Sequence, residues 1–205
     1  MKKQLIITLI VVFIYPFYLF AQNNNGLLKA PYLGETPPGI EPVLFAKGFI
    51  STDEHEFACS FSPDGKEFYF TRGFPNKAIY VSKYENAEWT KPVNALPTFR
   101  SESFEPHISP DGKKLFFMGF HFIPDTRRPN LDVFYAERIK NIWDNITHLE
   151  EPFNPNASMY ISTTFTGSIY TTSTQNGCDI AMSEFNNGIY SDFTILDSNI
   201  NTEDT

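Results

Sequence analysis

A ten-residue segment that occurs twice constrains the fold of this chain more than any other feature. The first copy runs from Phe61 to Phe70 (FSPDGKEFYF) and the second from Ile108 to Phe117 (ISPDGKKLFF). Each copy is an apolar run, a Pro-Asp-Gly turn and a second apolar run. Proline presets the first turn angle and glycine takes the left-handed angle that closes a hairpin. The segment therefore predicts a repeated β-hairpin.

A third, degenerate copy at 163–170 keeps only its glycine, Gly167, and the three turn glycines set a period of about 50 residues. A second tight turn follows in each repeat, at 86–87, 140–141 and 187–188. An aromatic residue comes shortly after each of these turns: Trp89, Trp143 and Tyr190. One interval is longer than the others, and its excess fits the Pro-rich loop 119–130. Four short antiparallel strands per repeat at this period are typical of propeller blades.

The second strand of each of the first two repeats is apolar at consecutive positions, 68–70 and 115–117. Such strands are covered on both faces, as they are when blades stack face to face. A two-layer sandwich would also use antiparallel strands, but repetition at one period favours the propeller. We therefore predict an all-β partial β-propeller of about three four-stranded antiparallel blades.

The repeats divide the chain into segments. Residues 22–54 form a lead-in with one strand at 42–46, and the blades occupy 55–97, 98–151 and 152–195. Closed propellers have at least four blades, and residues 196–205 resemble the approach to a truncated fourth. Our hypothesis is a truncated or split ring whose open edges permit self-association. A non-functional fragment is the alternative.

A family resemblance rests on the Ser-Pro-Asp-Gly-Lys turns, the Asp-Val-Phe and Asp-Ile-Ala strands and the segment 32–39 (YLGETPPG). Over about residues 31–200 the chain resembles the TolB-like, WD-type propeller repeat of exported bacterial proteins. The resemblance implies a six-bladed ring, of which three blades would be a fragment. It also implies a periplasmic or cell-surface binding module, and it implies no catalytic motif or cofactor.

The N-terminus has the pattern of an export signal. Lys2 and Lys3 precede an apolar run at 5–20, and a polar, Asn-rich stretch begins after Ala21. We expect residues 1–21 to be removed and the protein to be periplasmic or secreted, without stable membrane insertion. An uncleaved anchor is the alternative, although the run is short for a membrane span. No cysteine lies near the cleavage region, which argues against a lipoprotein.

The charge balance excludes one class of partner. The formal net charge is −8 and the chain has no basic run, so nucleic acid is not expected as a ligand. A partner protein or an envelope glycan is expected instead. Cys59 and Cys178 fall in different repeats. We expect them to be small buried residues rather than a disulfide, although export would permit a disulfide.

Antiparallel strands place their connections alternately on two faces. The Pro-Asp-Gly turns and the second tight turns share one, here called the turn face. The starts of the first strands and the loops after the second strands share the other, here called the strand-start face. This second face gathers the candidate binding residues, near the propeller axis where pockets form: His55, Glu56, Glu102, Glu105, His121, Arg127 and Arg128.

Two interpretations of these residues remain open. His55, Glu56, Glu102 and Glu105 could bind a divalent cation or supply the paired carboxylates of a glycosidase. Their spacing matches no established metal or catalytic motif, so solvated rim residues are the simpler interpretation. We therefore expect a non-catalytic binding protein without a cofactor, the alternative being a remnant or subunit of a propeller enzyme that acts on glycans or peptides.

Overall fold

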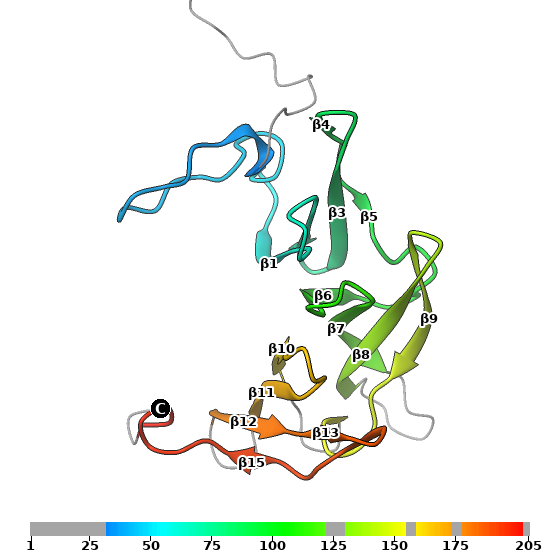
Figure 1. Cartoon of the computed structure of the whole chain (residues 1–205). Helices are drawn as coiled ribbons and strands as arrows, with labels where there is room; N and C mark the ends of the chain where they lie inside the picture. The colour runs from blue at the N-terminus through cyan, green and yellow to red at the C-terminus, as the bar shows by residue number, and fades with distance from the viewer. Residues whose placement is uncertain (1–31, 122–129, 155–158, 174–177, 203–205) are drawn as a thin grey trace, which may run out of the picture.

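Three antiparallel blades follow one another in an open arc in the computed structural model (Figure 1), which describes residues 32–121, 130–154, 159–173 and 178–202. The expected signal segment lies outside these residues. Within them, no helix is long and apolar enough to cross a membrane. The prediction of an all-β partial propeller with about three four-stranded antiparallel blades is confirmed.

Each blade is built from consecutive strands, and in blade 3 the strands β13 and β14 form a two-stranded sheet of their own. Blade 1 contains β1 (Glu56–Phe61), β2 (Glu67–Arg72), β3 (Ala78–Glu85), β4 (Glu88–Trp89) and β5 (Val93–Asn94). Blade 2 contains β6 (Ser103–Ile108), β7 (Lys114–His121), β8 (Asn130–Ile139) and β9 (Ile142–His148). Blade 3 contains β10 (Met159–Thr163), β11 (Ile169–Ser173), β12 (Asp179–Ser183), β13 (Phe185–Asn186), β14 (Ile189–Tyr190) and β15 (Thr194–Ile195). The first strands β1, β6 and β10 lie on the inside of the arc (Figure 1).

The Pro-Asp-Gly turns close the first hairpin of blades 1 and 2 in the same way. In blade 1, Gly65 has φ +69° and its N–H donates to the Ser62 carbonyl at 2.8 Å. The Ser62 hydroxyl donates to Asp64 Oδ1 at 2.6 Å and accepts from the Glu67 N–H at 2.9 Å. Ser109 and Asp111 repeat both side-chain contacts at the same distances in blade 2. These hydrogen bonds hold the pKa of both aspartates below its usual range. The turns are structural, as their sequence indicates.

The turns after the third strands have left-handed backbone at both central residues. Their φ values are +52° and +64° at Asn86 and Ala87, +49° and +65° at Lys140 and Asn141, and +53° and +86° at Asn187 and Gly188. Two left-handed residues define the type I′ turn, whose twist matches that of the strands it joins. Ala87 adopts this conformation without the freedom of glycine.

The fourth strand of blades 1 and 3 is split in two. At the break in blade 1, the buried Ser82 hydroxyl donates to the Thr90 carbonyl at 2.7 Å. In blade 3, Ser183 donates in the same way to Ser191 at 2.6 Å. A buried serine therefore satisfies the carbonyl that the interrupted ladder leaves open.

The blades are joined by apolar side chains that alternate between their two faces. Tyr69, Ile79 and Val81 of blade 1 pack against Leu115 and Phe117 of blade 2. The opposite face of blade 2 packs against blade 3 through a second cluster, which includes Phe116, Met118, Val133, Ile161 and Ile169. Both faces of the middle blade are thus buried, which explains the consecutive apolar residues of its second strand.

The lead-in covers the other face of blade 1. Its residues Leu33, Ala46, Phe49 and Ile50 pack with Phe68, Phe70 and Trp89 in a third apolar cluster. Arg72 fixes this cover, since its guanidinium donates to the Ile50 carbonyl at 2.9 Å and to Glu56 Oε1 at 2.9 Å. The lead-in therefore caps the first blade.

The strand predicted at 42–46 is wrong. This stretch is irregular, with Val43 and Leu44 exposed. The described lead-in has a short 3₁₀ element, η1 (Tyr32–Gly34), and an isolated bridge between Lys47 and Ser51, but no strand. Only its last two residues, Phe45 and Ala46, pack on the face of blade 1. No neighbouring strand within the described residues offers this stretch the hydrogen bonds of a ladder.

Asparagine side chains hydrogen-bond to the backbone of the third strand in blades 2 and 3. The Asn154 side chain accepts from the Val133 N–H at 2.7 Å and donates to the Val133 carbonyl at 3.1 Å. Asn201 makes the same pair of contacts with Ile180, at 2.8 and 3.0 Å. Residues 196–202 thus fold back on blade 3.

Both cysteines are free and exposed. The expectation that they are buried is therefore wrong. Cys59 lies on the innermost strand of its blade, where one side of the strand faces the open inside of the arc rather than another sheet.

Candidate functional site

The first strand of every blade contains a bulge at the same place. Ala58, Glu105 and Tyr160 lie in these bulges with φ of +45°, +55° and +56°. Each lies seven residues before the turn glycine of its blade. Left-handed backbone is costly for residues with a Cβ, and bulges of this kind commonly redirect side chains beside binding sites.

Hydrogen bonds connect these bulges across the blades. The Glu105 N–H donates to the Thr71 hydroxyl of blade 1 at 3.0 Å, and the Tyr160 N–H of blade 3 donates to Glu105 Oε2 at 3.3 Å. Thr71 pairs with Phe57 in the first hairpin. Phe57, Glu105 and Tyr160 therefore form a row across the inner strands of the three blades.

Glu105 is the unusual member of the row. Its side chain is half-buried, and burial raises the pKa of its carboxyl despite the hydrogen bond from the Tyr160 N–H. Within the described part of the chain no lysine or arginine lies within ion-pair distance of it. A carboxylate in this position favours a positively charged ligand.

The strand-start face also has exposed aromatic side chains. Tyr160 is 61% exposed and Phe74, in the loop after β2, is 72% exposed. The Phe74 ring lies 5.9 Å from the ring of His55, and Lys77 Nζ lies 5.7 Å from the Phe74 ring. Lys77 Nζ also lies 5.0 Å from the Phe104 ring, next to Glu105. The face thus combines acid and aromatic groups.

The other predicted carboxylates of this face already have partners. Glu56 pairs with Arg72 at 2.9 Å, and Glu102 pairs with Lys77 at 2.6 Å. His107 is satisfied too, because its Nε2 accepts from the Thr163 N–H at 3.0 Å. Among the predicted carboxylates, Glu105 is therefore the one without an ion-pair partner in the described part of the chain.

The remaining predicted residues add no described side-chain contact to this face. His121 ends β7, and Arg127 and Arg128 lie outside the described residues. Among the described residues, no group of three or more histidine, cysteine, aspartate or glutamate side chains could hold a metal ion. His55, Glu56, Glu102 and Glu105 thus do not form the cation site that remained open above.

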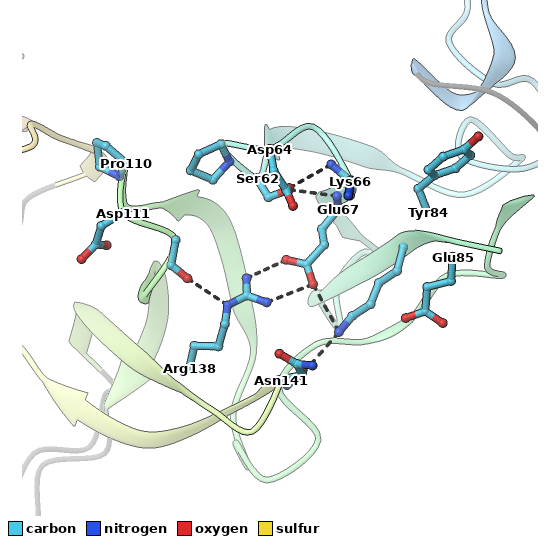
Figure 2. Close-up of a pocket in the computed structure, with 13 residues that line it drawn as sticks. Ser62, Asp64, Lys66, Glu67, Tyr84, Glu85, Pro110, Asp111, Arg138 and Asn141 are labelled. Atoms are coloured by element: carbon cyan, nitrogen blue, oxygen red, sulfur yellow. Dashed lines mark hydrogen bonds and ion pairs between the residues drawn. The ribbon is translucent and has the colours of Figure 1, made fainter. Parts of the chain in front are cut away.

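A second polar site lies on the turn face, between blades 1 and 2. Figure 2 shows this hollow of about 450 Å³, whose lining includes both Pro-Asp-Gly turns. At its floor, Arg138 of β8 donates to both carboxylate oxygens of Glu67 in β2, at 3.0 and 2.6 Å. Lys83 Nζ lies 3.2 Å from Glu67 Oε1, and Arg138 Nε donates to the Gly112 carbonyl at 2.8 Å.

Two aromatic side chains complete this network. The Tyr69 hydroxyl donates to Glu67 Oε2 at 2.9 Å and accepts from the Trp143 indole N–H at 3.0 Å. The Arg138 guanidinium lies 4.2 Å from the centre of the Trp143 ring. Burial alone would raise the pKa of Glu67, but the hydrogen bonds from Arg138 and Tyr69 hold that pKa below its usual range. Because its charges satisfy one another, the network joins two blades rather than awaiting a ligand.

Sequence reasoning missed this network, although two signals mark it. Glu67 opens a strand whose next three residues are aromatic, and Arg138 is a lone cation near the end of the longest third strand. Neither signal indicates a partner, because the two residues are 71 positions apart.

No protein-family model matches the chain, and no curated protein matches it. Among solved structures, a candidate 6-phosphogluconolactonase from Bacteroides uniformis matches with 19% identity and a TM-score of 0.41, over 72% of this chain and 43% of that one. An acylaminoacyl peptidase from Pyrococcus horikoshii matches with 13% identity and a TM-score of 0.39, over 69% of this chain and 25% of that one. The chain spans less than half the length of either structure.

The fold itself defines the class. The chain is an all-β repeat protein, an open arc of propeller blades. The site defined by its own residues is the acid and aromatic row of the strand-start face.

Proposed function

We propose that the chain is an exported, non-catalytic binding module of the TolB-like kind, which holds a partner protein on its strand-start face. The observation that carries this proposal is the surroundings of Glu105. This half-buried carboxylate lacks a cationic partner among the described residues and lies in a row with exposed aromatic rings.

The chemistry of this row favours a basic side chain of the partner. Removing a carboxylate from water is costly unless a cation or hydrogen-bond donors replace the water. One backbone N–H serves Glu105 now. A lysine or arginine of the partner would pair with the carboxylate, while Phe57 and Tyr160 would contact its methylene groups and its charge. The net charge of −8 favours the approach of such a segment.

The test uses two blocked tripeptides, Lys-Leu-Lys and Glu-Leu-Glu, titrated into the purified chain while its thermal unfolding midpoint is followed. The basic peptide should raise the midpoint, since a ligand that binds only the folded state stabilises it. The acidic peptide should not. Glu105→Gln should weaken binding of the basic peptide by about tenfold or more, the loss of one charge-assisted contact.

Glu85→Gln is the matched control, because Glu85 is an exposed carboxylate on the opposite face. This variant should bind the basic peptide as the native chain does. The proposal fails if both peptides bind equally well, or if Glu105→Gln and Tyr160→Ala leave the affinity of the basic peptide unchanged.

A further inference from the structure

The face of blade 3 that is turned away from blade 2 is equivalent to one face of blade 1 and one face of blade 2, and both of those faces are buried. One backbone hydrogen bond closes the first hairpin of each blade and aligns the three blades. Its acceptors are the carbonyls of Glu67, Lys114 and Ser168, and its donors are the N–H groups of Ser62, Ser109 and Thr164. This alignment accounts for the third turn being one residue shorter. It makes Tyr170 the equivalent of Tyr69 and Phe116, two positions beyond those residues.

Four positions on the second and third strands make up each of these faces. In blade 1 they are Tyr69, Thr71, Ile79 and Val81, all buried against blade 2. In blade 2 they are Phe116, Met118, Val133 and Tyr135, packed against blade 3. In blade 3 they are Tyr170, Thr172, Ile180 and Met182, here called the open face.

The open face has no cover among the described residues. Its side chains belong to none of the three apolar clusters, and Ile180 is 40% exposed. The neighbouring positions that point toward blade 2, Ile169 and Ala181, are fully buried. Blade 3 is thus built to be covered on both faces and is covered on one.

We propose that the open face binds the open face of a second copy of this chain, in a two-fold symmetric dimer. Among its described residues, a second copy offers no other free blade face. Its blade 1 is capped by its own lead-in, and both faces of its blade 2 are buried between neighbours. A two-fold contact uses the same surface on both partners, so this face must complement itself.

The composition of the open face permits such a contact. Tyr170, Thr172, Ile180 and Met182 are uncharged, as are Ser162 and Thr194, which pair with Tyr170 and Met182 on the flanking strands. Two copies of a chain with net charge −8 can therefore approach here without placing like charges in contact. The contact continues the blade-on-blade packing of the rest of the molecule.

Sedimentation equilibrium of the full chain over a range of concentrations tests the proposal. The native chain should show a concentration-dependent monomer–dimer equilibrium. Ile180→Glu and Ile180→Lys should each weaken the dimer by about tenfold or more, because the symmetry brings two like charges together. An equal mixture of the two variants should form a dimer again, since the charges are then opposite.

Ile142→Glu is the matched control, because Ile142 is 60% exposed on the outer strand of blade 2, away from this face. It should leave the dimer unchanged. Thr194→Arg provides a second disruption at an exposed position that tolerates a charge, and circular dichroism confirms that each variant is folded. A native chain that stays monomeric overturns the proposal. So does a dimer that survives both Ile180 substitutions and Thr194→Arg, or a mixture of the Ile180 variants that stays monomeric.

Discussion

Replacing Glu67 with glutamine should loosen the joint between blades 1 and 2. The native carboxylate accepts from both terminal nitrogens of Arg138 and from the Tyr69 hydroxyl, and it pairs with Lys83. Glutamine keeps the shape of the side chain but removes its charge. It also turns an amide N–H₂ toward donors, so that at least one guanidinium N–H loses its acceptor.

The cost follows from how deeply the pair is buried. The side chains of Glu67 and Arg138 are 13% and 21% exposed, which places the pair between a surface ion pair and a fully buried one. Breaking a buried pair costs about 3 to 5 kcal/mol and a surface pair below about 1 kcal/mol. We therefore expect a loss of about 2 to 3 kcal/mol in the free energy of unfolding. For a chain of this size that lowers the unfolding midpoint by about 5 to 10 °C.

Urea unfolding at pH 7 measures this loss, with Glu85→Gln as the control. Glu85 lines the same hollow, but it is exposed and makes no ion pair with a described residue. Its substitution should change the free energy of unfolding by less than about 0.5 kcal/mol. A double-mutant cycle with Arg138→Met should give a coupling of about 1 to 3 kcal/mol. Equal effects of Glu67→Gln and Glu85→Gln, or a coupling near zero, would refute the reasoning.

The same substitution predicts a change in pH dependence. The pKa of Glu67 is lowered in the folded protein from its ordinary value of 4.5. Its contribution is therefore fully present above about pH 4.5 and is lost as the pH falls through the folded pKa. The stability difference between the native chain and Glu67→Gln should be constant from pH 7 to about pH 5 and shrink in stronger acid. A difference that grows as the pH falls would contradict this sign.

Three further changes test other parts of the fold. Ala87→Gly should raise the free energy of unfolding by about 0.5 to 1 kcal/mol in urea titrations, because φ is +64° at this exposed turn residue. Asn154→Ala should lower it by about 2 kcal/mol, because the Val133 N–H loses its acceptor while the Val133 carbonyl keeps the Leu149 N–H; Asn199→Ala, at an exposed position, is the control. Glu105→Gln should stabilise the chain at pH 7. The folded pKa of Glu105 is raised, so the native carboxyl is protonated and costs no stability below its ordinary pKa of 4.5, and it destabilises the fold as the pH rises and it ionises. Thermal scans should therefore show the gain of the glutamine variant at pH 7 and its loss in acid.

The turns were predictable because the residues that determine each turn are adjacent in the sequence. Proline, aspartate and glycine in a row permit few backbone paths, and the turn at Gly65 has the predicted left-handed glycine. The serine before the proline carries equal weight, because the Ser62 hydroxyl bonds to Asp64. Thr164 and Thr166 repeat this contact at 2.8 Å in the degenerate third turn, which explains why that turn survives without proline.

The candidate site was predictable only in part, for a physical reason. Alternation of the turns placed Glu105 on the strand-start face, but its importance depends on which neighbours are already paired. Glu56 and Glu102 carry the same charge on the same face, and Arg72 and Lys77 neutralise them. These partners lie 16 and 25 residues away. The Glu56–Arg72 pair follows from the register of the first hairpin. The Glu102–Lys77 pair joins two blades and is set by how the blades stack, which the hairpin motif does not encode.

Repetition in the turns and variation between the blades serve different purposes. At the first interface the position after the turn is Glu67, which binds Arg138. At the second interface the equivalent residue is Lys114, which lies 4.2 Å from the Tyr135 ring and lines a hollow with Phe185, the equivalent of Arg138. Blade 3 in the place of blade 2 would therefore remove Arg138 from Glu67 and leave Lys83 as its cationic partner, which should destabilise this interface. Similar hairpins make each blade, and unlike interface residues fix the order in which the blades stack.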